Sequence, residues 1–206
     1  MSASFDFSSK HVFVFGGTSG INLGIAKSFA EAGAHVSVAS RSEDKVSAAV
    51  AELRELGPGA EGYSLDVRDA EAVAAAVADH AGKFGELDIL VSGAAGNFPA
   101  LAAKMSPNAF KSVVDIDLLG TFHVLRASFP YLKKPGASVI NISAPQAFIA
   151  MPLQSHVCAA KAGVDMLTRS LALEWGGLGI RVNSITPGPI DETEGMARLA
   201  PTEEAR

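Results

Sequence analysis

The chain has 206 residues, a formal net charge of −5 and 48% hydrophobic residues, with Cys158 as its only cysteine. The length suits one domain with a large core, and a weakly acidic chain without a basic run is not typical of nucleic-acid binding. The lone cysteine excludes an intrachain disulfide, residues 1–10 lack a signal-peptide core, and the apolar runs are shorter than the roughly 18 residues of a membrane span. We therefore expect a cytoplasmic protein with neither nucleic acid nor membrane as a partner.

Strand and helix patterns alternate along the chain. In chain order they predict strand Val12–Phe15, helix Ile21–Ala32, strand His35–Ala39, helix Lys45–Leu56 after an N-cap at Ser42, strand Glu61–Leu65, helix Ala70–Phe84, strand Leu87–Val91, a long helical region from Ser106 to Leu132 with an interruption near Met105–Asn108, strand Ser138–Ile142, helix Ser155–Trp175, strand Ile180–Ile185 and a short helix at Met196–Leu199.

Continuous apolar strands that alternate with helices indicate a parallel sheet covered on both faces. Right-handed crossovers then predict an α/β fold with a single doubly wound parallel sheet of six strands, the Rossmann arrangement. No linker, repeat or low-complexity tract divides residues 1–206, which we interpret as one domain.

The segment Val12–Ala26 carries the strongest functional signal. An apolar strand runs into Gly16-Gly17-Thr18-Ser19-Gly20-Ile21-Asn22 and then into a helical pattern. Glycines allow the backbone to approach a phosphate, and free N–H groups at a helix N-terminus favour an anion. The turn therefore indicates a nucleotide site, although a tight strand–helix connection without a ligand remains an alternative.

The second predicted strand ends at Ser40-Arg41-Ser42, without the carboxylate that commonly bonds the ribose 2′-hydroxyl in such folds. A carboxylate would repel a 2′-phosphate, whereas arginine pairs with phosphate through two parallel hydrogen bonds. Arg41, aided by Ser42, therefore favours NADP(H) as the cofactor. The alternative is an exposed arginine at the start of a helix.

The chain resembles the short-chain dehydrogenase/reductase family over nearly its whole length. Gly16–Asn22 stands at the cofactor turn, with Asn22 in place of the third glycine, and asparagine tolerates left-handed backbone angles. Ser92-Gly93-Ala94-Ala95-Gly96 replaces the usual Asn-Asn-Ala-Gly, and Thr193 follows a Pro-Gly turn that resembles the one at the nicotinamide end. The resemblance implies that the cofactor is bound by Gly16, Thr18, Ser19, Gly20, Ile21, Arg41, Ser42, Asp66, Val67, Ala94, Ala95, Gly96, Lys161, Pro187, Gly188 and Ile190.

The catalytic motif departs from that family. Its usual Tyr-x-x-x-Lys places both side chains on one helix face, where lysine lowers the tyrosine pKa and binds ribose. Lys161 is present, but the tyrosine position holds Val157, the usual serine falls on Ala144 and the usual asparagine falls on Asp117. Because valine and alanine cannot transfer a proton, ordinary carbonyl–alcohol chemistry by the usual acid is not expected.

One branch of the family, the 2,4-dienoyl-CoA reductases of the peroxisomal type, shows the same departure and has similar segments around Gly93–Phe98, Asp115–Phe122 and Pro187–Gly195. The resemblance implies NADPH-dependent reduction of a dienoyl thioester, or a related enoyl thioester, with Asp117 and Lys161 as the catalytic pair that holds a proton-donating water. Asn97, Phe98, Gln146 and His156 are the candidate substrate residues, and no metal site is expected.

Each of these residues has a structural alternative. Lys161 can serve only as the ribose clamp, Asp117 can be a buried partner of Lys161, and the four substrate candidates can be packing residues. Two other functions stay open for the chain: a short-chain oxidoreductase with another substrate and an atypical acid, and a non-catalytic cofactor-binding protein.

The resemblance has two further implications. Family members commonly form tetramers through the two long helices, so we expect a homo-oligomer, either a tetramer or a dimer. Members also continue through further helices and a seventh strand, so we expect that this domain is shortened at its C-terminus and lacks that strand.

Overall fold

The computed structural model describes residues 5–190 and Thr193. Its sheet has six parallel strands in the order β3-β2-β1-β4-β5-β6, which confirms the predicted doubly wound fold. The chain adds strands outward from β1 in one direction and then, from β4, in the other, so the site of such a fold is expected where β1 and β4 meet. The strands are β1 (His11–Phe15), β2 (His35–Ser40), β3 (Ala60–Ser64), β4 (Ile89–Ser92), β5 (Ser138–Ile142) and β6 (Arg181–Ile185).

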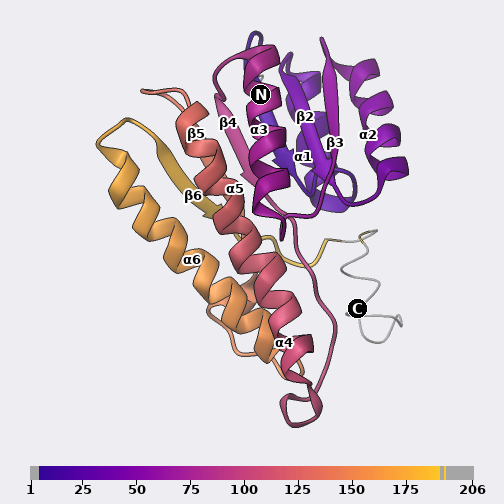
Figure 1. Cartoon of the computed structure of the whole chain (residues 1–206), viewed down its shortest axis with the longest axis vertical. Helices are drawn as coiled ribbons and strands as arrows, with labels where there is room; N and C mark the ends of the chain where they lie inside the picture. The colour runs from indigo at the N-terminus through magenta and orange to yellow at the C-terminus, as the bar shows by residue number, and fades with distance from the viewer. Residues whose placement is uncertain (1–4, 191–192, 194–206) are drawn as a thin grey trace, which may run out of the picture.

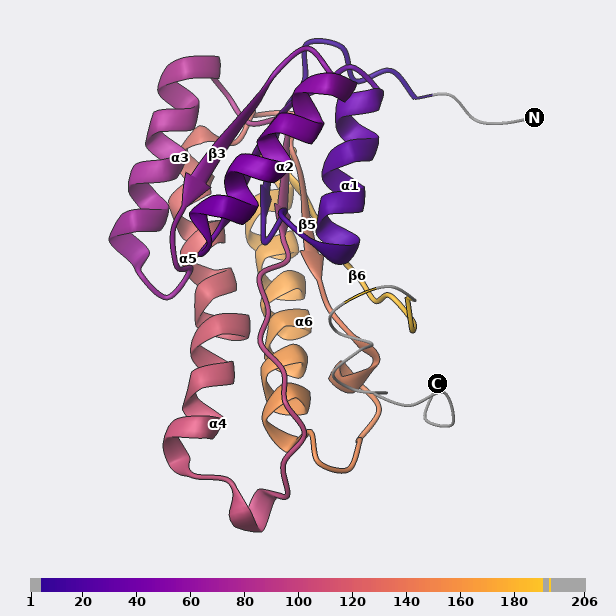
Figure 2. The same ribbon diagram turned by 90° about the vertical axis from the view of Figure 1, so that its right-hand side faces the viewer.

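The helices form a layer on each side of this sheet. Figure 2 shows α3, α4 and α5 on one side and α1 on the other. The cores agree: one joins the sheet to α1 and α2, and the other joins it to α3, α5 and α6. The helices are α1 (Gly20–Glu31), α2 (Glu43–Leu56), α3 (Ala70–Phe84), α4 (Pro107–Val113), α5 (Gly120–Ser128) and α6 (Ser155–Gly176), as labelled in Figure 1.

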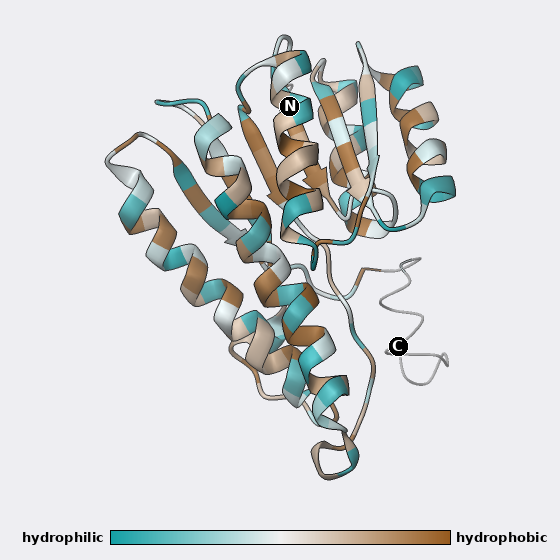
Figure 3. Cartoon of the chain, in the orientation of Figure 1, coloured by the Kyte–Doolittle hydropathy of each residue, from teal (hydrophilic) through white to brown (hydrophobic). Residues whose placement is uncertain are grey.

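Strand β1 shows how the sequence builds both cores at once. Successive side chains of a strand point to opposite faces. Val12 and Val14 therefore enter the core with α1 and α2, while Phe13 and Phe15 enter the other core, and all four are fully buried. The central strands are accordingly hydrophobic along their length in Figure 3.

Side-chain caps begin several of the helices. Ser42 accepts from the N–H of Lys45 at the start of α2, as predicted, and Asp69 accepts from two N–H groups at the start of α3. Ser106 caps α4, with Pro107 at the first helical position. Such caps satisfy N–H groups that have no partner within the helix.

The long helical region predicted from Ser106 to Leu132 is confirmed, but it is not a uniform α-helix. A π-helical segment, η2 (Val114–Leu119), lies between α4 and α5, and a short 3-10 turn, η3 (Phe129–Tyr131), ends the region. Two other short turns, η1 (Ala102–Lys104) and η4 (Pro145–Ala147), were not predicted. Single π turns inside helices are frequent at functional sites.

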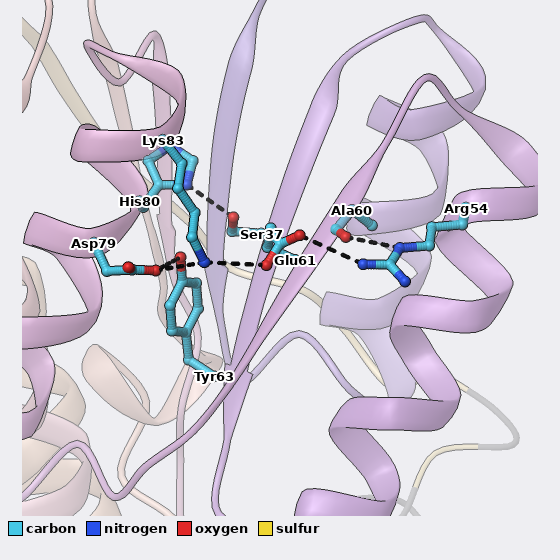
Figure 4. A network of polar contacts seen from close by, with 8 residues as sticks. All are labelled: Ser37, Arg54, Ala60, Glu61, Tyr63, Asp79, His80 and Lys83. Atoms are coloured by element: carbon cyan, nitrogen blue, oxygen red, sulfur yellow. Dashed lines mark hydrogen bonds and ion pairs between the residues drawn. The ribbon is translucent and has the colours of Figure 1, made fainter.

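A polar network fastens the edge strand β3 to both helical layers (Figure 4). Tyr63 donates to Asp79 at 2.8 Å, and Lys83 lies 2.8 Å from Asp79 and 3.4 Å from Glu61. On the opposite side, Nε of Arg54 donates to the carbonyl of Ala60 at 3.0 Å. Burial and the neighbouring Asp79 raise the pKa of Tyr63, so this tyrosine stays protonated as a donor.

His80 lies beneath that network and is fully buried, with its Nδ1 atom 2.8 Å from the hydroxyl of Ser37 (Figure 4). Burial lowers the pKa of His80 to about 4. The imidazole is therefore neutral near neutral pH, which has a consequence for stability in acid.

None of the helices within residues 5–190 has the length and apolar character needed to cross a membrane. The short helix predicted at Met196–Leu199 lies outside the described residues.

Candidate active site

The glycine turn between β1 and α1 has the geometry expected of a phosphate cradle. Gly16 and Gly20 have φ angles of 77° and 52°, a region that favours glycine. A Cβ atom on Gly16 would lie 2.8 Å from the backbone nitrogen of Ala94. Ser19 is the N-cap residue of α1, yet its side chain makes no capping hydrogen bond. Ser19 thus leaves the N–H groups that open α1 without a side-chain cap, and such groups favour an anion.

The end of β2 lies beside this turn. The hydroxyl of Thr18 donates to that of Ser40 at 2.8 Å, which brings Arg41 and the N-terminus of α2 to the same edge of the sheet. Arg68 is the main cause of the lowered pKa of Asp66, and the exposed Arg41 adds to it, so Arg41 and Asp66 are near one another. The carboxylate of Asp66 is mainly paired with Arg68.

The segment after β6 also returns to the cofactor turn. A Cβ atom on Gly20 would lie 3.6 Å from the methyl group of Thr193, and the Thr193 hydroxyl donates to the carbonyl of Ile190 at 2.8 Å. The predicted Pro187-Gly188-Pro189-Ile190 segment thus lies next to the head of α1.

Asp117 and Lys161 meet below the ends of the strands, as predicted. Asp117 is 1% exposed and Lys161 is 6% exposed, and their Oδ2 and Nζ atoms are 3.4 Å apart. The N–H of Gly96 donates to Oδ1 of Asp117 at 2.7 Å, and Lys161 donates to the carbonyl of Ile142 at 2.9 Å. The π segment η2, the loop after β4 and helix α6 therefore meet at one carboxylate, and the end of β5 holds its lysine partner.

The electrostatics of this pair are set by opposing effects. Burial raises the pKa of Asp117, while the ammonium of Lys161 and the N–H of Gly96 act to lower it. Burial also lowers the pKa of His156, so that this imidazole is neutral beside the pair. A carboxyl group whose pKa is raised towards neutrality can accept and release a proton more readily than an ordinary aspartate.

The candidate substrate residues supply buried polar atoms without a protein partner. His156 is 0% exposed, and neither ring nitrogen has a partner at hydrogen-bond geometry, although the backbone of Phe98 lies near enough to act against the lowering of its pKa by burial. Its ring lies 4.5 Å from that of Phe98. The Oδ1 atom of Asn97 is likewise without a partner, as is Oε1 of Gln146, whose Nε2 atom donates to Gln154 at 2.7 Å. Unsatisfied buried groups call for an explanation, and a bound ligand or water supplies one.

The place of the usual tyrosine is occupied by apolar packing. Val157 is 3% exposed and packs in a small core cluster with Val113 and Ala160, against which Phe98 and Leu118 also pack. This cluster seals the face of α6 on which the tyrosine would stand. The prediction that the usual acid is absent therefore has a structural counterpart.

Asn22 has a role that the sequence did not reveal. Its tolerance of left-handed backbone angles is not used: Asn22 lies within α1, and Ser9 and Leu153 are the non-glycine residues of the described chain with positive φ. Its Nδ2 atom instead donates to the carbonyl of Gly93 at 2.8 Å. The absence of a side chain at position 93 was the feature of the sequence that could have indicated this contact.

No group of three or more His, Cys, Asp or Glu side chains is arranged to hold a metal ion within residues 5–190 and 193.

The fold and this site define a nicotinamide-dependent oxidoreductase of the Rossmann type. The family model for short chain dehydrogenases matches residues 10–204, and the chain belongs to that family.

Within that family, the chain is similar to proteins named as 2,4-dienoyl-CoA reductases. The chain is 47% identical over 203 residues to a peroxisomal 2,4-dienoyl-CoA reductase of Arabidopsis thaliana, covering 92% of this chain and 67% of that protein. It is 46% identical over 192 residues to the Rattus norvegicus enzyme of the same name, covering 92% of this chain and 66% of that one. The chain thus spans about two thirds of the length of these relatives.

Solved structures agree with the fold. Carveol dehydrogenase from Mycobacterium avium, in complex with NAD, superposes with a TM-score of 0.91 at 26% identity, over 98% of this chain and 79% of that one. A short chain dehydrogenase from Burkholderia cenocepacia, in complex with NADP, gives a TM-score of 0.86 at 29% identity, over 91% of this chain and 76% of that one. A nicotinamide cofactor is therefore supported, without distinction between NAD and NADP.

Proposed function

We propose that this chain carries the NADPH-dependent reduction of a 2,4-dienoyl-CoA, or a related enoyl thioester. The observation that carries the proposal is the buried pair of Asp117 and Lys161 beside a cofactor turn, in a chain where Val157 fills the place of the usual acid. The names of the relatives support the substrate class. Because the chain spans only part of those relatives, its activity needs its own test.

The residues present fit a dinucleotide. A Cβ atom on Gly16 would collide with the backbone of Ala94, and the positive φ of Gly20 would be strained with any other residue. Beside these glycines, the N-terminus of α1 offers N–H groups to a diphosphate. Arg41 favours the 2′-phosphate of NADP(H), since the tip of β2 carries no carboxylate of its own. Asp66 lies near Arg41, but Arg68 engages its carboxylate.

When bound, the reduced nicotinamide supplies a hydride to the δ carbon of the conjugated thioester. The electron pairs then shift towards the thioester oxygen, and a proton must reach the α carbon, which leaves one double bond between the β and γ carbons. We assign delivery of that proton to a water held between Asp117 and Lys161. Lys161 donates to the water and Asp117 accepts from it, while neutral His156 and Asn97 offer polar groups to the thioester.

The direct test is the loss of NADPH absorbance with a 2,4-dienoyl-CoA as the substrate. Turnover with a β,γ-unsaturated product supports the proposal. Turnover only of a simple carbonyl or alcohol would favour another short-chain oxidoreductase. Tight NADPH binding without turnover of any thioester or carbonyl would favour a non-catalytic cofactor-binding protein.

We also propose that the chain assembles as a homo-oligomer, a dimer or a tetramer, through α5 and α6. Large apolar side chains are exposed on these helices, among them Phe122, Met166 and Leu173. Light scattering of the purified protein measures the assembly directly, and a monomer at working concentration would contradict it.

A cytoplasmic location remains our prediction, although the relatives are named as peroxisomal; imaging of the tagged protein tests it.

A further inference from the structure

Positions 22 and 93 are in contact between the cofactor turn and the loop after β4. Asn22, near the start of α1, carries an amide side chain, and Gly93, directly after β4, carries none. The two positions are 71 residues apart in the chain, yet Nδ2 of Asn22 donates to the carbonyl of Gly93 at 2.8 Å.

The Asn22 amide fills the space in which a side chain at position 93 would begin. A Cβ atom on Gly93 would approach the amide group of Asn22 to less than 3.0 Å, a distance that real Cβ atoms essentially never show. The Asn22 amide therefore occupies the volume that a side chain at position 93 would need. A side chain at position 93 would therefore displace the Asn22 amide and break its hydrogen bond to the Gly93 carbonyl.

The same loop is held against the cofactor turn at two further points. The N–H of Gly93 donates to the carbonyl of Phe15 at 3.0 Å. A Cβ atom on Gly16 would lie 2.9 Å from the carbonyl carbon of Gly93. The turn and the loop are thus in backbone contact, and the hydrogen bond from the Asn22 side chain to Gly93 adds a further contact between them.

This loop leads directly to the proposed proton-handling pair. Three residues after Gly93, the N–H of Gly96 donates to Oδ1 of Asp117 at 2.7 Å, and Asp117 faces Lys161 at 3.4 Å. A displacement of the loop at Gly93 would alter the hydrogen bond that holds the carboxylate. The Oδ1 atom of Asn22 is buried without a partner, so the amide makes only the hydrogen bond to Gly93 and leaves one polar atom unsatisfied. A buried polar atom without a partner calls for an explanation, such as a role in holding this loop.

We infer that Asn22 is a positioning residue, which replaces a side chain at position 93 and locks the Gly93–Gly96 loop so that the cofactor turn and the Asp117–Lys161 pair keep one geometry. This inference rests on the cofactor site and the reaction proposed above. It assigns to Asn22 no contact with the substrate.

The test is a double-mutant cycle between Asn22→Gly and Gly93→Ala, with NADPH affinity by fluorescence, kcat against pH and thermal stability as readouts. Gly93→Ala alone should weaken NADPH binding about tenfold and lower kcat, because the new methyl group collides with the Asn22 amide. In the Asn22→Gly background the same substitution should cost less than about twofold, since the amide is gone.

Asn22→Gly alone should move the acidic limb of the kcat profile to higher pH, because a loosened loop weakens the Gly96 hydrogen bond to Asp117. Loss of stability alone would not move this limb. Gly24→Ala is the matched control on α1, where a Cβ atom meets nothing within 4 Å. It should leave NADPH affinity and the pH profile unchanged and should raise thermal stability slightly, because alanine is the better helix former.

Equal penalties for Gly93→Ala in both backgrounds would overturn the inference, as would an Asn22→Gly variant with an unchanged pH profile. If Gly93→Ala does not fold, then folding and NADPH binding of the double variant still decide the question. A wild-type protein that binds no nicotinamide cofactor would instead refute the proposed function.

Discussion

The carboxylate of Asp117 faces the ammonium group of Lys161 across 3.4 Å, and the N–H of Gly96 holds the other carboxylate oxygen at 2.7 Å. Three elements that lie far apart in the chain therefore fix one titratable group. This arrangement stands in the part of the fold where the usual tyrosine is replaced by Val157.

Replacement of Asp117 by asparagine should lower kcat for the thioester by about 10² to 10⁴-fold, the usual contribution of general acid–base catalysis. Asparagine retains the shape and can still accept from Gly96, so NADPH binding should change little. Stopped-flow and fluorescence titration separate the two effects. Asp115→Asn, in the same π segment but paired with Lys111 at the surface, is the control and should leave kcat unchanged. An Asp117→Asn variant with full kcat would exclude the relay.

The pH dependence of kcat should have an acidic limb above the range of an ordinary aspartate. Burial raises the pKa of Asp117, so the carboxylate that orients the water is lost at a higher pH than usual. The limb should vanish in Asp117→Asn, if residual activity can be followed. A limb in the ordinary aspartate range would contradict this assignment.

A tyrosine placed at position 157 should not restore the family's usual chemistry. Val157 is 3% exposed within a packed cluster, and overpacking of a core typically costs about 1–3 kcal/mol. Urea denaturation of Val157→Tyr should show this loss, without new activity on simple carbonyls. Ser170→Tyr, at an exposed position of α6, should change stability by less than about 0.5 kcal/mol. A stable Val157→Tyr variant would show that the cluster has room.

Removal of the Arg41 side chain should discriminate between the cofactors. Arg41→Ala should weaken NADPH binding by about 10 to 100-fold, because a charge-assisted pair with phosphate is lost, and should leave NADH binding nearly unchanged. Arg169→Ala, exposed on α6, serves as the control for the loss of a positive charge. Equal effects on both cofactors would show that Arg41 does not read the 2′-phosphate.

Acid should destabilise the fold through His80. Its folded-state pKa of about 4 lies below the ordinary value of 6.5, so unfolding takes up a proton between these values and stability falls as the pH falls. The loss should reach about 2 kcal/mol at about pH 5. Urea denaturation at neutral pH and at about pH 5 measures this loss. His80→Asn should be less stable at neutral pH but should lose this part of the pH dependence; an unchanged slope would exclude His80 as the cause.

The fold could be predicted from the sequence because its strands are buried on both faces. A run such as Val12–Phe15 is apolar without a break, and the glycine turn that follows marks the start of a helix. The short turns η1 and η4 could not be predicted, since they depend on how loops pack against the ends of α6 and the sheet.

The candidate site was predictable where spacing along a helix sets the geometry, and not where tertiary contacts do. Lys161 and Asp117 were identified through the family motif, and the structure brings them together. The π segment around Asp117 has the same apolar spacing as an α-helix, so its presence is invisible in the sequence. The contact of Asn22 with Gly93 joins positions 71 residues apart, and it became apparent only in the folded chain.

The central claim is that this chain reduces a dienoyl thioester with a hydride from NADPH and a proton from water. Mass spectrometry of the product formed in heavy water from a 2,4-dienoyl-CoA and NADPH tests it most directly. The account predicts a β,γ-unsaturated thioester with solvent deuterium at the α carbon and none at the δ carbon. An α,β-unsaturated product, or no oxidation of bound NADPH in the presence of the dienoyl-CoA, would contradict it.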